Sequence, residues 1–339
     1  MPEVRDPGLV PALKAPSATL FDAPFVRPED VAGNQIGVVG MPSDWTHSSR
    51  IGARLGPRAL RRATTELLAA SFDLASTDCV DPDSGAQLSM RRGRWIVDCG
   101  DAKIDPASVE HTTEAIAKMT CTVRARGGIP LSLGGDHYNS YPACLGYSRA
   151  LAEKEPEARF GYIQMDGHLD FSDELGAWGA LNHATNGRRI SELPNVVQAN
   201  MVWIGITGWV DGGDLELIEN MGGRVFSSGD VHRLGAETVA RQAVSHAMRG
   251  VDRLYLSIDI DAMDAGFLPG TGSIVHSGIT PSQYCRMLDI IGVAPIDGLD
   301  IAEVAPSLDP SGRTERIAAH MLFRVLRNRM FVSSPAQSV

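Results

Sequence analysis

Apolar residues fall in short runs of strand length, separated by longer stretches with helical periodicity. The short runs are apolar throughout, which is typical of strands buried on both faces of a parallel sheet. We predict strands at about residues 35–40, 94–98, 129–133, 160–165, 200–206, 223–227, 253–258 and 296–301. We predict helices at about 57–70, 107–126, 140–153, 212–221, 234–249, 280–292 and 313–328. This alternation predicts a three-layer α/β/α fold with a mostly parallel central sheet of about eight strands.

One helix start carries a complete signature. Thr280 can be the N-cap, Pro281 fits the first helical position, and Gln283 completes a capping box. We find no internal repeat and no linker. The pattern therefore predicts a Pro-rich N-terminal arm over residues 1–33, one domain over 34–330 and a short tail over 331–339.

Composition narrows the class of protein. The chain has 339 residues and a formal net charge of −10, which argues against a nucleic-acid surface. Its five cysteines are scattered without a C-x-x-C pair, as in reduced cytoplasmic proteins. No uninterrupted apolar stretch approaches the roughly 18 residues that a membrane span needs. We expect a cytoplasmic protein with neither a nucleic-acid nor a membrane partner.

Potential metal ligands gather in the runs D-x-H-x-D (166–170) and D-x-D (259–261) and in a Gly-Gly-Asp-His segment (134–137). Alternate residues of an extended chain point to the same side. Four carboxylates aimed at one place would repel each other unless cations lay between them. Two divalent metals sharing carboxylates solve this problem. The candidate ligands are His137, Asp166, His168, Asp170, Asp259 and Asp261.

The placement of these residues supports the interpretation. His137, Asp166 and Asp259 each lie at the carboxyl end of a predicted strand, and so does Glu303. Open α/β sheets bind their ligands at that edge. A single D-x-D or a lone histidine is weak evidence, but the three motifs in this order indicate a binuclear site. Mixed Asp and His ligands suit Mn, Ni, Fe or Zn.

With these motifs the chain resembles the ureohydrolases, the arginase and agmatinase superfamily, over about residues 35–328. The matching segments are residues 40–44 (GMPSD), 50–57 (RIGARLGP), 134–137 (GGDH), 165–170 (MDGHLD), 257–261 (SIDID), 268–272 (LPGTG) and 300–306 (DIAEVAP). The resemblance implies an arginase-like fold and a hydrolase of linear amidines that carries two Mn or Ni ions.

The resemblance also implies roles for individual ligands. Asp166 and Asp259 would bridge the two metals. His137 and Asp170 would complete one site, and His168 and Asp261 would complete the other. The neighbouring Asp136 would orient His137 rather than bind metal.

The implied chemistry is attack on a guanidinium carbon. Two metals lower the pKa of the water that bridges them, giving hydroxide near neutral pH. Collapse of the tetrahedral intermediate releases urea or a urea derivative together with an amine or ammonia. Asp170 would relay the proton, Glu303 would bind the guanidinium through two parallel N–H bonds, and His183 would shuttle a proton or contact substrate. For Glu303 and His183, the alternative is an ordinary surface acid and an ordinary loop histidine.

The chain departs from the family pattern around the expected pocket. Tyr138 replaces a small residue, Trp178 lies in an unusual loop, and His276 lies in an altered pocket wall at 273–278. Trp178 either stacks on a cationic substrate or packs its loop. Together these residues favour guanidine, an N-alkylguanidine or a biguanide, and the chain looks like the nickel-dependent guanidine and biguanide hydrolase branch.

Other interpretations stay open. The chain could be an agmatinase or a guanidinobutyrase, a subunit that supports a paralogous partner in a mixed oligomer, or a deacetylase or phosphoesterase with related metal geometry. The family implies a homo-oligomer, a trimer or a hexamer. We interpret the remaining histidines as structural, among them His47, His111, His232, His246 and His320.

Overall fold

The computed structural model describes residues 18–71, 78–80, 87–89 and 95–330. Its core is an eight-stranded sheet in the order β4-β1-β5-β10-β9-β6-β7-β8, and every neighbouring pair is parallel. The strands are β1 (Ile36–Met41), β4 (Ile96–Asp101), β5 (Ile129–Gly134), β6 (Phe160–Met165), β7 (Val196–Ile206), β8 (Arg224–Ser227), β9 (Leu254–Asp259) and β10 (Ile296–Ala302). The predicted parallel α/β sheet is confirmed.

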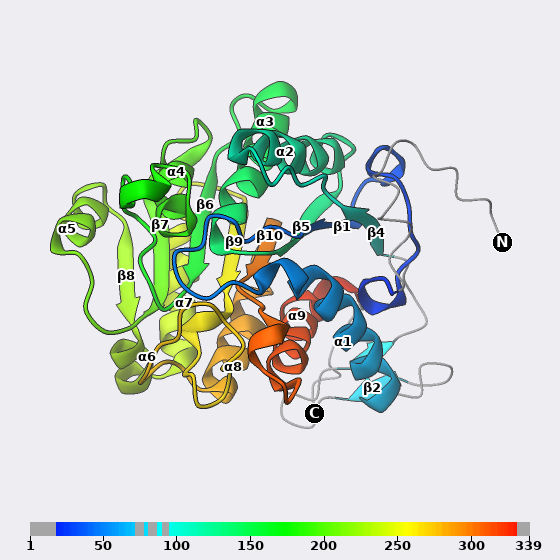
Figure 1. Ribbon diagram of the computed structural model, residues 1–339. Coiled ribbons are helices and arrows are strands. Elements are labelled where there is room, and N and C mark those ends of the chain that lie inside the picture. The colour runs from blue at the N-terminus through cyan, green and yellow to red at the C-terminus, as the bar shows by residue number, and fades with distance from the viewer. Residues whose placement is uncertain (1–17, 72–77, 81–86, 90–94, 331–339) are drawn as a thin grey trace, which may run out of the picture.

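Helices cover both faces of this sheet, as Figure 1 shows. They are α1 (Gly56–Ser71), α2 (Val109–Ala125), α3 (Ser140–Lys154), α4 (Asn186–Ser191), α5 (Gly212–Asn220), α6 (Ser228–Leu234), α7 (Ala236–Ala247), α8 (Pro281–Ile291) and α9 (Arg313–Met330). Helices α2 and α3 pack together on one face, and α1, α7, α8 and α9 lie on the other. The strands between them are buried on both sides, which explains their continuous apolar runs.

The sequence signals and the structure differ mainly at short elements. All eight predicted strands and all seven predicted helices are present with ends shifted by a few residues. Helices α4 and α6, with 6 and 7 residues, and the small antiparallel pair β2 (Asp78–Val80) and β3 (Gln87–Ser89) were not predicted. They are too short to show a period. The capping box of α8 is confirmed: Thr280 Oγ1 accepts from the backbone N–H of Gln283.

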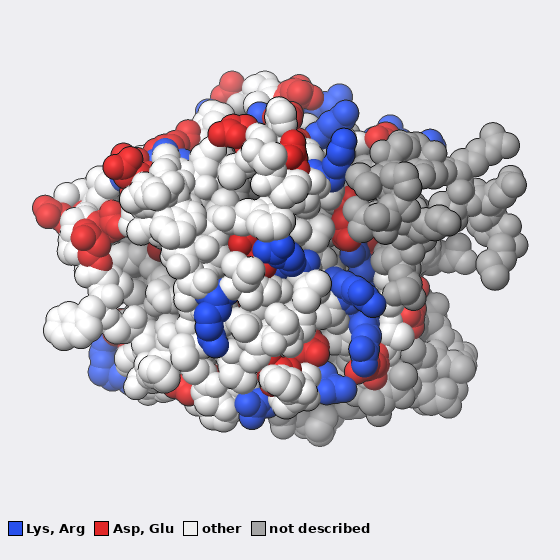
Figure 2. Space-filling model, in the orientation of Figure 1, with Lys and Arg blue, Asp and Glu red and all other residues white. Residues whose placement is uncertain are grey.

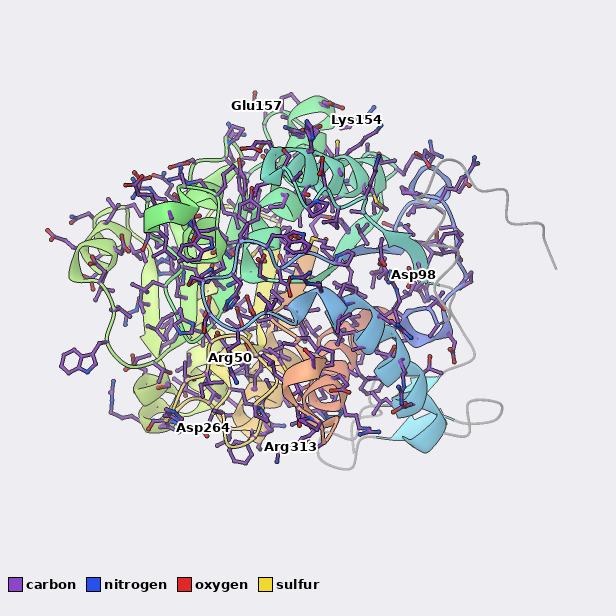
Figure 3. All side chains as sticks on the ribbon, viewed as in Figure 1. Arg50, Asp98, Lys154, Glu157, Asp264 and Arg313 are labelled. Carbon is purple, nitrogen blue, oxygen red and sulfur yellow. The ribbon has the colours of Figure 1, made fainter. Side chains whose placement is uncertain are left out.

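The described part of the N-terminal segment packs on its own domain. Leu20 and Phe21 are buried, and their backbone N–H groups donate to Asp98 Oδ2 and Thr64 Oγ1. Asp98, which is labelled in Figure 3, also pairs with the buried Arg61 at 2.8 Å. Residues 1–17 of the predicted arm and the tail at 331–339 lie outside the described residues.

The outer surface is of mixed charge on the face that Figure 2 presents, where basic and acidic side chains are interspersed. Among the described residues, no helix has the length and apolar character needed to cross a membrane.

The topology fixes where chemistry can gather. Strands β5, β10, β9 and β6 are consecutive neighbours in the middle of the sheet. Their carboxyl ends therefore meet at one edge, and His137, Glu303, Asp259 and Asp166 lie there, at the end of a strand or within a few residues beyond it. Four segments that are distant in sequence supply one site.

Candidate metal centre and its pocket

The first group of ligands surrounds His137, in the turn after β5. Its Nδ1 atom lies 2.8 Å from an oxygen of Asp170, 3.0 Å from one of Asp166 and 3.1 Å from one of Asp259. A ring nitrogen carries at most one proton, so it cannot donate to three carboxylates at once. Convergence of one nitrogen and three carboxylate oxygens within 4.8 Å is the arrangement of ligands around a cation.

The second group adjoins the first. Asp166, His168 and Asp261 also bring one ligand atom each within 4.8 Å of one another. His168 Nδ1 lies 3.1 Å from Asp261 Oδ2 and 3.6 Å from Asp166 Oδ1. Asp166 thus turns its two oxygens to different groups, as a bridging carboxylate does. Asp259 lies in the first group only.

The electrostatics of the cluster favour bound cations. Asp166, Asp259 and Asp261 are each at most 2% exposed. In the protein alone, burial and then the charge of Asp261 raise the pKa of Asp259 well above its usual value. Burial likewise raises the pKa of Asp261 to about 6, although His168 opposes the shift. Carboxylates that resist ionisation in this way regain their charge when divalent ions lie between them. The donor set therefore fits two divalent metals.

Buried hydrogen bonds hold the ligands in place. Gln164 Nε2 donates to Asp166 Oδ2 at 2.7 Å. On the far side of the His137 ring, Nε2 lies 3.0 Å from Ser257 Oγ, which in turn donates to Asp300 Oδ1 at 2.9 Å. Such partners fix ring orientation and raise ligand basicity. The sequence motifs contained Ser257 and Asp300 but gave no sign that the two touch.

Asp136 stays out of both groups. It accepts hydrogen bonds from the backbone N–H and the hydroxyl of Thr46 and from Asn139 Nδ2. Burial and the charge of Glu303 raise its pKa to about 8. It therefore anchors the loop after β1 next to His137, in line with the supporting role inferred for it.

Two site residues have strained backbones. Asp170 has φ = 47° and Glu303 has φ = 64°, in the left-handed region that non-glycine residues rarely occupy. The cost is of the order of 1–3 kcal/mol for each residue, and such strain is concentrated at functional sites. The bends aim both side chains at the cluster rather than along the sheet.

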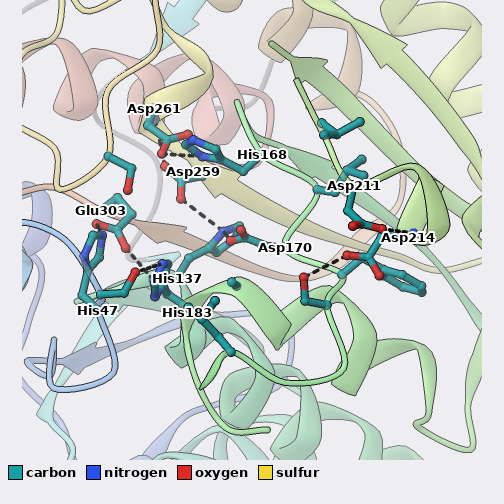
Figure 4. A pocket seen from close by; sticks show the side chains of 18 of the residues that line it. His47, His137, His168, Asp170, His183, Asp211, Asp214, Asp259, Asp261 and Glu303 are labelled. Atoms are coloured by element: carbon teal, nitrogen blue, oxygen red, sulfur yellow. Dashed lines mark hydrogen bonds and ion pairs between the residues drawn. The ribbon is translucent and has the colours of Figure 1, made fainter. Parts of the chain in front are cut away.

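A pocket of about 300 Å³ opens over the cluster. Figure 4 shows His47, His183 and Glu303 on one side of it and Asp211 and Asp214 on the opposite side, at the start of α5. Among the described residues that line this pocket there is no lysine and no arginine. The pocket wall is therefore neutral or acidic.

Glu303 has the geometry of a cation receptor. It is 2% exposed, its Oε1 accepts from the backbone N–H of His137 at 2.9 Å, and its Oε2 has no close hydrogen-bond donor. Burial disfavours its charge, but His47 beside it lowers the pKa below the usual value. A buried, ionised oxygen thus keeps free accepting capacity toward the pocket.

Three residues that we predicted in the substrate pocket are not among the residues that line it. Tyr138 is 1% exposed, is hydrogen-bonded to Thr113 and lines a separate cavity. Trp178 is 47% exposed in a 3₁₀ turn, and His276 is exposed on its loop; neither lines the metal pocket. Sequence position near a motif does not fix the direction of a side chain in an irregular loop, and the turn after β5 sends Tyr138 behind the site.

His47 was missed. Its side chain is 1% exposed, lines the pocket and lies 3.4 Å from Glu303 Oε2. Its ring stacks on that of His183, with centroids 4.4 Å apart and planes at 10°. The only available signal was its place between two family motifs, residues 40–44 and 50–57.

Comparison with known proteins agrees with this geometry. Residues 34–327 match the arginase family. The chain is 30% identical to a guanidinopropionase of Pseudomonas aeruginosa, over 88% of this chain and 87% of that protein, and 29% identical to an agmatinase of Chromobacterium violaceum, over 88% and 86%. The structure of a proclavaminate amidino hydrolase from Streptomyces clavuligerus superposes with a TM-score of 0.76 at 25% identity, covering 92% of this chain and 97% of that one.

The chain belongs to the arginase family, the ureohydrolase superfamily. It is a hydrolase that acts on carbon–nitrogen bonds of guanidino compounds.

Proposed function

We propose that this enzyme hydrolyses a small guanidino compound without an anionic end: guanidine, an N-alkylguanidine or a biguanide. Two divalent ions, Ni or Mn, would be held by the two groups of ligands. Asp166 belongs to both groups, whereas the sharing of Asp259 is what the family resemblance implies. When bound, the two ions would lower the pKa of a water molecule enough to give hydroxide near neutral pH, and hydroxide can attack the guanidinium carbon. The products are urea or a urea derivative and an amine or ammonia.

Glu303 carries this proposal. A carboxylate accepts two parallel N–H bonds from a guanidinium, and the pair fixes the plane of the substrate. The Oε2 atom of Glu303 is buried, points into the pocket and lacks a close donor. A guanidinium bound there has its central carbon toward the ligand cluster.

His183 and Asp170 are positioned for proton transfer. The Nδ1 atom of His183 donates to the carbonyl oxygen of Thr46 at 3.0 Å, so the neutral ring has its lone pair on Nε2. This Nε2 faces Ser48 Oγ at 3.2 Å at the pocket wall. Asp170, inside the cluster, would take the proton of the attacking water. His183 Nε2 would first accept a proton from solvent at the pocket wall and then pass it to the departing nitrogen.

The charge of the pocket supports the substrate class. A guanidino acid brings a carboxylate, which would need a cationic partner, and none is among the described lining residues. This weighs against guanidinopropionate and guanidinobutyrate. Tyr138 and Trp178 do not line the pocket, so the preference for a substrate without an anionic end rests on charge.

A second candidate is agmatine. Asp211 and Asp214 lie across the pocket from Glu303, where they could meet the distal ammonium of a diamine-like substrate. One of the relatives described above is an agmatinase.

The test is urea and ammonia release by protein loaded separately with Ni and Mn. The panel is guanidine, N-methylguanidine, a biguanide, agmatine, 4-guanidinobutyrate and arginine, with Asp259→Ala protein as the control for contaminating activity. We expect turnover of a panel compound that carries no anionic group: guanidine, N-methylguanidine, the biguanide or agmatine. A clear preference for 4-guanidinobutyrate or arginine would refute the substrate assignment, and silence with two metals bound would refute this substrate set.

We also propose that the enzyme is a homo-oligomer, a trimer or a hexamer, in the cytoplasm. The four described cysteines outside β2 are free thiols, which supports a reducing compartment. A role as a supporting subunit in a mixed oligomer is less well supported, because all six ligands are present and converge. Light scattering of the purified chain, with the urea assay on the same sample, separates these cases.

A further inference from the structure

Residues 46–50, in the loop between β1 and α1, contact side chains or loops of the site. Thr46 is hydrogen-bonded to Asp136 and its carbonyl accepts from His183. Ser48 contacts the same histidine. His47, the second residue of this segment, lies against Glu303. The segment therefore joins the guanidinium receptor to the histidine of the proton step.

The hydrogen bonds of His47 fix its tautomer. Its Nδ1 accepts from the backbone N–H of Ser49 at 3.0 Å. The proton of the neutral ring is therefore on Nε2, which lies 3.4 Å from Glu303 Oε2. At that distance the N–H contributes an orienting electrostatic contact and leaves the oxygen free to accept from a ligand.

The ring of His47 has little freedom to move. On one side it stacks on His183. On another it abuts Gly272, where an added Cβ would come within 2.4 Å of Nε2. Arg50, labelled in Figure 3, holds that glycine's loop by donating to the carbonyl oxygens of Thr271 at 2.7 Å and Gly272 at 3.2 Å. Two loops and one ring thus enclose the imidazole.

We propose that His47 is a positioning residue for guanidinium binding: its Nε2–H sets the plane of the Glu303 carboxylate. The backbone N–H of His137 holds Oε1 at 2.9 Å, and His47 holds the Oε2 side. A carboxylate that is hydrogen-bonded at Oε1 and faces an N–H group at Oε2 presents its remaining lone pairs in one orientation, which is what a planar guanidinium needs for two parallel hydrogen bonds. This inference rests on the proposed role of Glu303 as the substrate anchor.

The alternative is that His47 only fills space beneath His183. Two substitutions separate the roles. Gln at position 47 restores an N–H donor near the Nε2 position but removes the ring. Phe retains a ring that can stack but has no donor. Both remove the ring Nδ1 that accepts from the backbone N–H of Ser49, although the Gln amide oxygen is itself an acceptor.

The experiment compares kcat and KM of wild-type, His47→Gln and His47→Phe protein on whichever guanidino compound the wild type hydrolyses, with metal content measured on each sample. We expect His47→Gln to keep kcat/KM within about threefold. His47→Phe should lose at least tenfold, mainly through KM, with two metals still bound. The reverse order, or equal activity of all three proteins, would overturn the proposal. So would loss of metal from both variants, because His47 would then support the ligands.

A second readout does not depend on turnover. In ¹⁵N-histidine NMR spectra of the wild type loaded with diamagnetic Zn²⁺, the signals assigned by their loss in His47→Gln should show the Nε2–H tautomer. A Nδ1–H tautomer would overturn the proposal, since no donor would then face Glu303. A wild type that hydrolyses none of the panel but shows the Nε2–H form would instead indicate that the proposed substrate, and not the orientation of His47, is wrong.

Discussion

The two ends of β9 and β10 carry charged clusters of opposite character. At the amino ends, Arg253 and Asp297 meet Arg124 and Glu155: Arg253 Nη1 lies 2.9 Å from Asp297 Oδ2, and Arg124 Nη2 lies 2.8 Å from Glu155 Oε1. Arg253 also pairs with Glu155. Two cations and two anions of the same chain thus neutralise each other.

At the carboxyl ends the charges do not balance. Asp259 and Asp261 from β9 and its following turn meet Asp166 and Asp170 from the β6 end, and within these two ligand groups of the described chain the cationic candidates are two histidines. No arginine or lysine lies among the described residues of this pocket. Because a buried, uncompensated charge costs several kcal/mol, the excess carboxylates either bind protons, as the raised pKa values of Asp259 and Asp261 indicate, or bind cations from outside the chain. Charge balance therefore distinguishes a structural cluster from a metal centre on the same two strands.

Removal of a shared carboxylate should have the largest effect. Asp259→Ala removes one ligand of the first group, and this ligand is also the second carboxylate that we propose the two metals share. We therefore expect loss of bound metal and urea release below detection. Metal analysis by mass spectrometry and the urea assay check this. Asp252→Ala, at the other end of β9 with an 83% exposed side chain, is the matched control and should change neither. Retained activity in Asp259→Ala would contradict the metal mechanism.

His183→Ala should separate chemistry from metal binding. Its ring bonds to Thr46 and Ser48 rather than to the ligand groups. We expect unchanged metal content and a fall in kcat of about 10²–10⁴-fold, the usual contribution of a general acid or base. Metal loss in this variant would show that His183 belongs to the metal centre.

Glu303→Gln should weaken substrate binding while the metals remain. Loss of one charge from a buried, hydrogen-bonded pair costs about 2–5 kcal/mol, so kcat/KM should fall by roughly thirtyfold to several thousandfold. Steady-state kinetics with metal analysis on the same sample measure this. An unchanged kcat/KM would remove Glu303 as the guanidinium receptor.

The amino-end cluster should affect stability alone. Asp297→Ala leaves Arg124 and Arg253 short of an anion and removes the acceptor of the Tyr147 hydroxyl. We expect a loss of about 1–3 kcal/mol in the free energy of unfolding, seen as a lower Tm, with kcat and metal content unchanged. A specific fall in kcat at full stability would show that the two ends are coupled.

The long helices and strands and the short ligand motifs were predictable from the sequence, because the geometry of each depends on neighbouring residues in the chain. The β-strands of the central sheet are buried on both faces and so are continuously apolar, and alternate residues in the 166–170 run reach one place because the chain is extended there. Which ligands from different strands belong to the same metal was predicted only from the resemblance to the family, because a local pattern does not contain this information.

The remaining parts depend on the path of irregular loops. Trp178 was expected near the substrate, but a tight turn at residues 176–178 leaves it at the surface. His47 was considered structural, yet Thr46 and Ser49 turn its ring against Glu303. The position of His47 depends on a hydrogen bond between Thr46 and Asp136, which are 90 residues apart, and that of Trp178 depends on a turn without a period. A local sequence pattern contains neither.

The most direct test of the charge-balance account is a metal titration of the chelator-stripped enzyme, with urea release followed after each addition of Ni or Mn. The account predicts no activity without metal and a plateau at two equivalents per chain. Full urea release in the presence of excess chelator, with no metal bound, would contradict it.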